Sequence, residues 1–390
     1  MDTTGPHGVE AARAGDPVAL TRLLVSTPSV NPTLAPGGAG EQRIAEVTAE
    51  LLEGWGLTTK IQEVGPGRVN VVATLEGTGP TLLLNGHLDT VGVDGMIVDP
   101  FGGVVDGDRL IGRGACDMKG GVAALLAATA RLASEGARPN LIVALTADEE
   151  HASLGMAALV ANGVKADLAV VCEPTELSVM PAHKGFVWLR ARFRGRAAHG
   201  SRPDIGVDAI RHAALFIAAL DAYAEALQTR PAHALLGHGS FHAGTITGGT
   251  AESVYPDSCE LVLERRTLPG ELPADVVADF ERVLDTLRQR EPLIDGSIVM
   301  TLERPGTEVP SESALVRGLL EASESVGLVP VIEGMTAWVD AAFLNEAGIP
   351  AVCYGPGSIE QAHTEDEWID VGQIRSCADV LERFARRLVA

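Results

Sequence analysis

Five polar residues of this chain have the types and the spacing expected of metal ligands. Two are histidines, whose neutral imidazoles are good zinc ligands, and three are acidic. The charges of two Zn²⁺ ions would be balanced by three carboxylates and one bridging hydroxide, and such a pair suits hydrolysis because bound water becomes more acidic. Mg²⁺ sites prefer oxygen ligands and would not use two histidines. The five residues are His87, Asp117, Glu150, Glu173 and His363.

Each of these signals is weak when it is taken alone. His87 could be a turn histidine beside a capping Asp89, or a metal ligand whose second ring N–H is held by the Asp89 carboxylate. Asp117 precedes a helical stretch and could simply cap that helix. Glu149 and Glu150 could form a solvated acidic loop. If the segment is extended, however, their side chains point in opposite directions, so one could bind a metal while the other acts as a base.

The candidate ligands follow apolar segments that predict buried strands. Residues 81–85, 141–147 and 167–172 are short apolar runs, and helical patterns separate them. This alternation predicts an α/β domain with a mostly parallel sheet. The carboxyl ends of parallel strands are where sites are built in such sheets, so we expect the polar residues to meet there.

A different pattern begins near residue 185. It predicts a β-α-β-β-α-β order, which is the ferredoxin-like α+β arrangement. We therefore expect a metal-binding catalytic domain of residues 1–184 and 305–390, interrupted by an inserted domain of residues 185–304. The predicted elements of the insertion are strands 186–193, 241–248, 257–266 and 297–303 and helices 206–227 and 273–290.

The composition is typical of a globular protein of about two domains, with 390 residues, 46% hydrophobic and 21% charged. A net charge of -22 argues against nucleic acid or an anionic membrane as a partner. The five cysteines are scattered and form no C-x-x-C motif, which predicts neither disulfides nor a zinc knuckle. No signal peptide and no apolar run of about 18 residues is found, so we expect a cytoplasmic protein.

Five motifs in order along the chain are similar to those of a known enzyme family. The chain resembles the dinuclear-zinc amidohydrolases and peptidases that include acetylornithine deacetylase, succinyl-diaminopimelate desuccinylase, aminoacylase-1 and carboxypeptidase G. The resemblance covers nearly the whole chain. The motifs are Gly86-His-Leu-Asp-Thr90, Gly112-Arg-Gly-Ala-Cys-Asp-Met-Lys-Gly-Gly121, Thr146-Ala-Asp-Glu-Glu150, Cys172-Glu-Pro-Thr175 and Gly355-Pro-Gly-Ser-Ile-Glu-Gln-Ala-His363.

The resemblance implies a role for each residue of the site. It implies that the five candidate ligands hold two Zn²⁺ ions, which Co²⁺ or Mn²⁺ can replace, and that Asp117 bridges them. It implies that Glu149 is the general base and that Asp89 orients His87. It also implies a non-proline cis peptide bond after Asp117.

The resemblance assigns the inserted segment to a lid and dimerisation domain. His199 would then reach the active site of the partner subunit in a homodimer and stabilise the oxyanion. Arg266 would bind the substrate carboxylate, a task that suits a bidentate guanidinium. Ser253 stands where many relatives carry an asparagine that contacts the substrate, and Gly357 is a further expected substrate contact.

The expected activity is hydrolysis of the amide bond of a small N-acyl amino acid, as in N-acetylornithine deacetylase. A dipeptidase, a carboxypeptidase or a desuccinylase would use the same chemistry with a different acyl pocket. A metal-free scaffold protein is the alternative from another class, but such relatives typically lose ligands or the base, and this chain keeps all of them.

Overall fold

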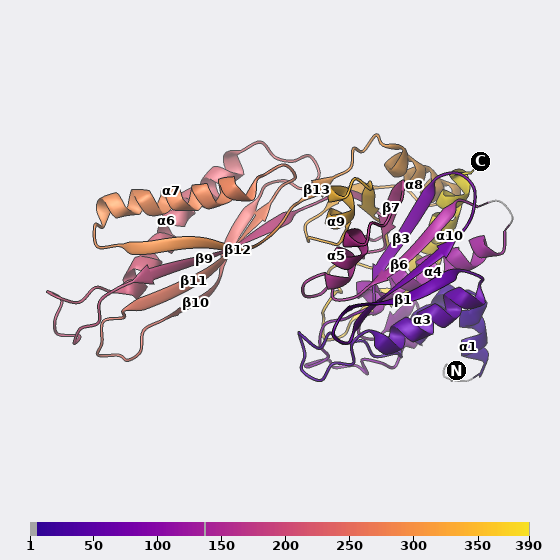
Figure 1. Ribbon diagram of the computed structural model, residues 1–390, viewed down its shortest axis with the longest axis horizontal. Helices are drawn as coiled ribbons and strands as arrows, with labels where there is room; N and C mark the ends of the chain where they lie inside the picture. The colour runs from indigo at the N-terminus through magenta and orange to yellow at the C-terminus, as the bar shows by residue number, and fades with distance from the viewer. Residues whose placement is uncertain (1–5, 136–137, 390) are drawn as a thin grey trace. The chain divides into compact units, whose positions relative to one another are not determined.

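Two units of structure make up the chain (Figure 1). The computed structural model describes residues 6–135 and 138–389. The first unit comprises Met1–Pro181, Val309–Glu333 and Val339–Ala390, and the second comprises Ala182–Glu308 and Gly334–Trp338. The expected insertion, 185–304, lies within the second unit. Residues 1–5, where a signal peptide would begin, are outside the described residues.

A large sheet has most of its strands in the first unit. Its strands are β1 (Thr58–Gly65), β2 (Arg68–Leu75), β3 (Thr81–His87), β6 (Asn140–Thr146), β7 (Leu168–Val171), β8 (Val179–His183), β13 (Thr307–Glu308), β14 (Ile332–Met335) and β15 (Ala351–Cys353). They lie in the order β1-β2-β6-β3-β7-β15-β8-β13, and β14 also pairs with β8. The middle strands β6, β3, β7 and β15 are parallel, and antiparallel strands flank them. This confirms the predicted α/β class.

The apolar runs seen in the sequence are the central strands of this sheet. Strand β3 has parallel neighbours at both edges, and its residues Leu82–His87 are all buried. A strand covered on both faces reads as a continuous apolar run rather than as an alternation. The same holds for β7, which is buried over Ala169–Val171. These strands therefore end inside the protein. Because β3 and β7 are neighbours, the residues that follow them lie close to one another.

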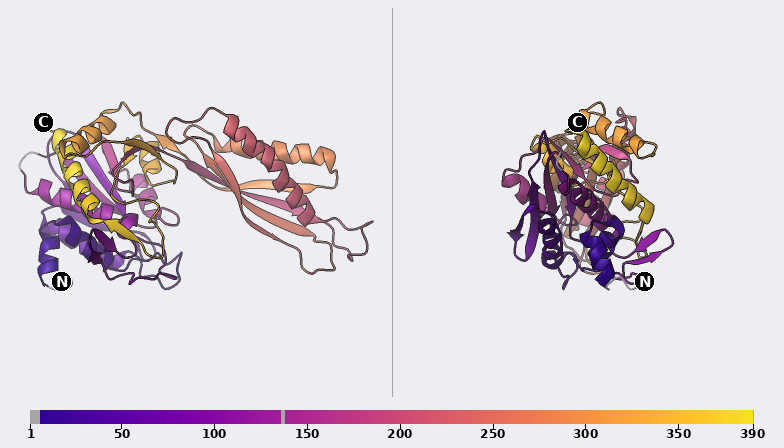
Figure 2. Two further views of the ribbon diagram at one scale, coloured as in Figure 1. Left: turned by 180° about the vertical axis from the view of Figure 1, so that it is seen from behind. Right: turned by 90° about the vertical axis from the view of Figure 1, so that its right-hand side faces the viewer.

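Helices cover the sheet of the first unit. They are α1 (Pro6–Arg13), α2 (Pro17–Val25), α3 (Gln42–Gly54), α4 (Gly120–Ala133), α5 (Leu154–Ala161), α8 (Ala314–Ser325), α9 (Ala341–Glu346) and α10 (Val371–Arg387). Helix α10 packs against α4, α8 and α2, and is in front of the sheet in the left view of Figure 2. Helices α5 and α9 contact each other and are in front of the sheet in Figure 1. The buried apolar side chains of α4, α8 and α10 form one core with those of the central strands.

The first unit also contains a small sheet. Its strands are β4 (Val104–Asp106), β5 (Arg109–Ile111) and β16 (Trp368–Asp370), in the order β16-β5-β4. Strand β16 pairs with β5 in an antiparallel register that places Trp368 opposite Ile111. This pairing joins a segment near the C-terminus to the segment that leads into Asp117.

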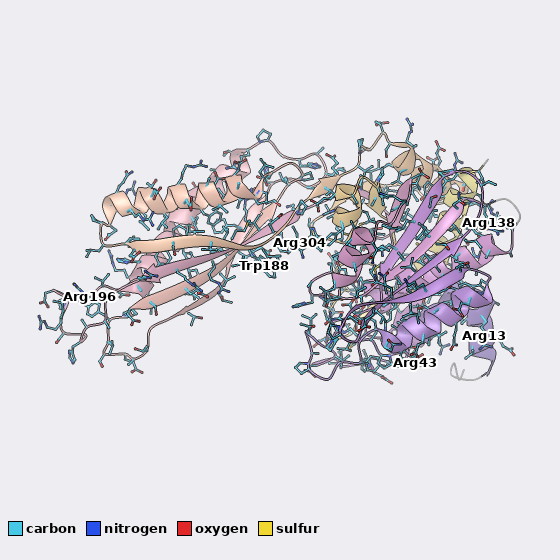
Figure 3. All side chains as sticks on the ribbon, in the orientation of Figure 1. Arg13, Arg43, Arg138, Trp188, Arg196 and Arg304 are labelled. Carbon is cyan, nitrogen blue, oxygen red and sulfur yellow. The ribbon has the colours of Figure 1, made fainter. Side chains whose placement is uncertain are left out.

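The second unit has the predicted ferredoxin-like order. Its elements are β9 (Gly185–Arg194), α6 (Ala209–Thr229), β10 (Ser240–Gly248), β11 (Ser258–Thr267), α7 (Pro273–Arg290) and β12 (Asp295–Arg304). The antiparallel strands lie in the order β10-β11-β9-β12, and both helices pack on one face. Buried residues alternate along β9, and Trp188 is among the outward-facing ones (Figure 3).

Within residues 6–135 and 138–389, no helix has both the length and the apolar character needed to cross a membrane.

We predict that Gly121→Ala destabilises the protein. A Cβ atom at Gly121 in α4 would lie 2.0 Å from the carbonyl oxygen of Cys172, the residue before Glu173. Because backbone on both sides must move, we expect the free energy of unfolding to fall by about 1–3 kcal/mol, measured by chemical denaturation. The matched control is Gly54→Ala at the end of α3, where a Cβ has no neighbour within 4 Å. The control should be neutral or stabilising by up to about 1 kcal/mol, and equal behaviour of both variants would contradict this packing argument.

Candidate metal centre

The polar residues singled out in the sequence lie at the carboxyl ends of the parallel strands. His87 is the last residue of β3, and Asp148–Glu150 follow β6. Glu173 comes shortly after β7, and His363 lies on the segment that follows β15. Since these four strands are adjacent and parallel, their ends share one edge of the sheet. The residues lie close together because their strands are neighbours in the sheet, although the strands are far apart in the sequence.

Asp117 lies between two imidazoles. His87 Nε2 is 3.0 Å from Asp117 Oδ1, and His363 Nε2 is 3.4 Å from Asp117 Oδ2. Glu150 Oε2 is 3.0 Å from His363 Nε2. Ligand atoms of His87, Asp117 and Glu150 lie within 4.8 Å of one another, which is close enough for one ion to contact all three.

The hydrogen bonds of His87 leave its second nitrogen facing an acceptor. Its Nδ1 is 2.9 Å from the main-chain carbonyl oxygen of Asp89, which can only accept, so Nδ1 carries a proton. In the neutral ring Nε2 then bears a lone pair, yet it faces a carboxylate oxygen of Asp117. Two acceptors at that distance need a proton or a metal ion between them. Burial lowers the pKa of His87, but Asp117 and Glu173 raise it further, to well above the usual value.

The Asp89 carboxylate contacts the main chain of the two glutamates more closely than the His87 ring. Its Oδ1 is 3.8 Å from His87 Nδ1. The same oxygen accepts the N–H of Glu149 at 3.1 Å, and Oδ2 accepts the N–H of Glu150 at 3.3 Å. Asp89 therefore fixes the ring through its carbonyl group and fixes the Glu149–Glu150 segment through its side chain.

The segment that carries the two glutamates is a turn rather than the extended stretch assumed from the sequence. Asp148 has a φ of 68°, in the left-handed region, and is fully buried. Its Oδ1 accepts hydrogen bonds from Arg68 Nη1 at 2.8 Å and from Asn31 Nδ2 at 3.0 Å. The buried ion pair with Arg68 holds a conformation that a non-glycine residue rarely adopts.

The sequence analysis missed the buried arginine that supports this turn. Arg68 also donates to both carboxylate oxygens of Glu41, through hydrogen bonds that include one from Nε to Oε2 at 2.8 Å. Glu41 comes just before α3, and Arg68 opens β2. The only signal in the sequence is a charged residue at the start of an apolar strand, which is also the ordinary pattern of a strand end.

Asp117 does not cap the following helix. Its backbone is extended, with φ -120° and ψ 96°, and α4 begins at Gly120. The peptide bond between Asp117 and Met118 is cis, as the family resemblance implied. The capping alternative is therefore wrong.

The site buries more negative than positive charge. Burial and the charge of Asp117 raise the pKa of Glu173 to about 8, and its Oε1 has no hydrogen-bond partner in the described chain. Burial and the neighbouring Glu173 also raise the pKa of Glu149 well above its usual value. Asp340, which the sequence did not single out, has its pKa raised to about 7, chiefly by burial, and its Oδ1 is unpaired among the described residues.

These observations fit a bound cation. Buried carboxylates need a compensating positive charge, and two histidines do not balance five acidic groups. His363 is the more exposed of the two, and hydrogen bonds to Asp117 and Glu150 raise its pKa to about 10. A set of imidazole nitrogens and carboxylate oxygens is the donor chemistry of Zn²⁺ and similar transition metals. The five acidic groups are Asp117, Glu149, Glu150, Glu173 and Asp340.

The predicted substrate residues belong to both units. Gly357 lies in the first unit with a φ of 90°, and a Cβ there would meet Cys116 Sγ at 2.6 Å. His199 and Ser253 are neighbours in the second unit, where Gly200 N–H donates to the Ser253 carbonyl at 2.7 Å. Arg266, on β11, donates to Glu264 at 2.6 Å and its guanidinium lies 5.5 Å from the Phe186 ring centre.

Comparison with known proteins assigns the chain to a family. The model of Peptidase family M20/M25/M40 matches residues 83–387. Acetylornithine deacetylase from Myxococcus xanthus is 34% identical over 333 residues, which are 83% of this chain and 85% of that protein. The enzyme of that name from Proteus mirabilis (strain HI4320) is 32% identical over 377 residues, 93% of this chain and 94% of that protein.

Solved structures of this family have the same fold. Aminopeptidase PepT from Bacillus cereus ATCC 10987 superposes with a TM-score of 0.80 at 22% identity and covers 96% of this chain and 98% of its own. The Bacillus subtilis YXEP protein, described as a dinuclear metal binding peptidase, has a TM-score of 0.74 at 17% identity and covers 97% of this chain and 99% of its own. The chain is therefore a member of the M20/M25/M40 metallopeptidase family, whose enzymes hydrolyse amide bonds.

Proposed function

We propose that the protein is a metal-dependent hydrolase that removes the acyl group from a small N-acyl amino acid, with N-acetylornithine as the first substrate to test. The observation that carries this proposal is the contact of Asp117 with His87 on one side and His363 on the other, beside Glu150. Relatives named acetylornithine deacetylase, at 32–34% identity, support the choice of substrate.

The metal ligands of the proposed enzyme are the five residues predicted from the sequence. They would hold two Zn²⁺ ions, which Co²⁺ or Mn²⁺ could replace, and Asp117 lies between the two histidines of the set. When bound, the ions supply the positive charge that the buried carboxylates need, acidify a water molecule and polarise the amide carbonyl. The five ligands are His87, Asp117, Glu150, Glu173 and His363.

Glu149 is the general base of this mechanism. Its pKa is raised by burial and by Glu173, which makes the carboxylate a better proton acceptor near neutral pH. Its carboxylate takes a proton from the attacking water and gives it to the nitrogen of the departing amine. The Asp89 carboxylate accepts the main-chain N–H of Glu149 at 3.1 Å and so fixes the position of the Glu149 main chain. Glu149 needs no place among the metal ligands.

The substrate contacts of the proposed enzyme come from the second unit, apart from Gly357, which belongs to the first. His199 of one subunit donates a hydrogen bond to the oxyanion formed in the other subunit of a homodimer. Arg266 binds the substrate carboxylate as a bidentate donor. Ser253 and Gly357 line the binding site. The cytoplasmic location expected from the sequence is part of the same proposal.

The substrate class is tested with a panel of amides. The protein purified with Zn²⁺ or Co²⁺ should give its highest kcat/KM on N-acetyl-L-ornithine or another N-acetyl amino acid, compared with N-succinyl-diaminopimelate and with dipeptides. Removing the metal with a chelator should abolish turnover, and adding it back should restore it. Highest activity on a dipeptide or on the succinyl substrate would replace the deacetylase with a peptidase or a desuccinylase. Full activity without metal would contradict the metal mechanism itself.

We predict that Glu149→Gln keeps its metal and loses turnover. The substitution removes the proton acceptor without removing a ligand, so kcat should fall by about 10²–10⁴-fold while the metal content remains that of the unmodified protein. Steady-state kinetics and metal analysis of the same preparation measure both quantities. Glu346→Gln, at the exposed end of α9, makes the same change of charge and should behave as the unmodified enzyme. A Glu149→Gln enzyme of normal activity would remove this residue from the mechanism.

The homodimer is tested by mixing two inactive variants. In a dimer that shares His199 between subunits, one chain with Glu149→Gln and one with His199→Ala together contain one complete site. Random re-pairing at equal concentrations gives about half heterodimers, so activity should recover to about a quarter of the unmodified value. Subunit exchange is followed by native mass spectrometry of a size-tagged variant. Exchange without recovery would place His199 in the site of its own subunit or outside catalysis.

A further inference from the structure

Glu367 makes an unusual set of hydrogen bonds that the mechanism above does not use. Its Oε1 accepts the main-chain N–H of Cys116 at 2.9 Å and that of Asp117 at 3.1 Å. Its Oε2 accepts the N–H of Gly114 at 2.9 Å and Nη1 of Arg113 at 2.7 Å. One carboxylate thus binds four donors from the five-residue segment that ends at the central ligand candidate.

The fold brings Glu367 to this place from the other end of the chain. It is 250 residues from Asp117 and directly precedes β16, which pairs with β5. The main-chain carbonyl oxygen of Glu367 extends the pairing of β16 with β5 by accepting the N–H of Gly112 at 3.0 Å. The side chain is 1% exposed. Water therefore does not compete for the Glu367 carboxylate. The hydrogen bonds of this carboxylate to the loop are stronger than they would be in solvent.

The loop is shaped to bind a carboxylate. Gly114 has a φ of 75°, and a Cβ there would lie 2.5 Å from Thr90 Cγ2, so the loop depends on glycine at this position. A left-handed residue followed by further N–H groups forms a concave surface of donors that binds an anion. Arg113 adds a full positive charge to the same carboxylate, and its Nε is held by the Gly92 carbonyl at 3.0 Å.

The bond from Asp117 N–H ties this carboxylate to the metal centre. The side chain of Asp117 must present one oxygen toward His87 and the other toward His363, so a small shift of its main chain would misplace both. Asp117 is extended and lies before α4, so the helix does not hold its N–H. Glu367 does.

We propose that Glu367 is a positioning residue of the metal centre, because its carboxylate fixes the main chain of Cys116 and Asp117 so that the Asp117 carboxylate lies between His87 and His363. This inference rests on the proposed function, since it assigns Glu367 a role toward the metal held by those residues. Glu367 itself touches neither substrate nor metal in this role. Its effect is on how tightly and in what geometry the metal is bound.

The conservative variant Glu367→Gln tests this role. The amide keeps the size of the side chain but replaces one acceptor oxygen with an NH₂ donor, which must face donors of the loop. The matched control is Glu365→Gln, an identical change two residues away at an exposed side chain. Metal affinity of each chelator-stripped protein is measured by competition with a chromophoric chelator for Zn²⁺. The visible spectrum of the Co²⁺-loaded protein reports the coordination geometry.

We expect Glu367→Gln to bind Zn²⁺ about 10–100-fold more weakly and to show a changed Co²⁺ spectrum. Glu365→Gln should match the unmodified protein in both measurements. Circular dichroism and thermal unfolding of the metal-free proteins establish that each variant is folded. If Glu367→Gln is not folded, Glu367→Asp replaces it, because the shorter side chain keeps the charge but cannot reach all four donors.

The outcomes separate this inference from the function it rests on. If the unmodified protein binds neither Zn²⁺ nor Co²⁺, the metal-dependent function fails and this inference fails with it. If the unmodified protein binds metal and the folded Glu367 variant binds it equally well, the positioning role alone is overturned. The same holds if the variant only unfolds at a lower temperature while its Co²⁺ spectrum is unchanged, since that is the behaviour of a purely structural contact.

Discussion

The buried excess of carboxylates at one edge of the large sheet is the constraint on which the rest of the structure depends. Taking several acidic groups out of water is unfavourable unless positive charge or hydrogen-bond donors compensate them. Glu173 and Asp340 each retain an oxygen without a partner in the described chain. The parallel strands β3 and β7 are buried, so the residues that follow them begin inside the protein. A bound cation removes the penalty.

Around this centre, main-chain N–H groups and the buried arginines Arg68 and Arg113 hold acidic side chains in place. Asp89 accepts the N–H groups that begin the Glu149–Glu150 segment. Arg68 neutralises Asp148 beneath the same segment. Asp89 and Asp148 thus hold the segment that carries Glu149 and Glu150. Acidic residues at neighbouring positions therefore have different partners: Asp148 contacts Arg68, and Glu150 contacts His363.

Much of the fold could be predicted from local patterns. Helix α7 has the predicted bounds because Pro273 starts it with a fixed φ, and the central strands were visible as apolar runs. The left-handed turn at Asp148 could not be predicted, because a buried ion pair with a residue 80 positions away stabilises it. Asp340 directly precedes the short helix α9. An aspartate at that position predicts an ordinary helix cap, but the side chain of Asp340 makes no capping hydrogen bond. Contacts that depend on strand order leave no trace in local sequence.

Because Arg68 pairs with Asp148, the part of the chain before the family match belongs to the same folding unit as the candidate site. The family match begins at residue 83, after Arg68 and also after Glu41, Asn31 and helix α3. A fragment cut at that boundary would contain every candidate metal ligand and the proposed base Glu149. It would nevertheless leave Asp148 without its arginine and Asp89 without the amide of Asn31. The stretch before the match therefore supplies one cation, Arg68, and one amide, Asn31, to the buried turn that leads into Glu149 and Glu150.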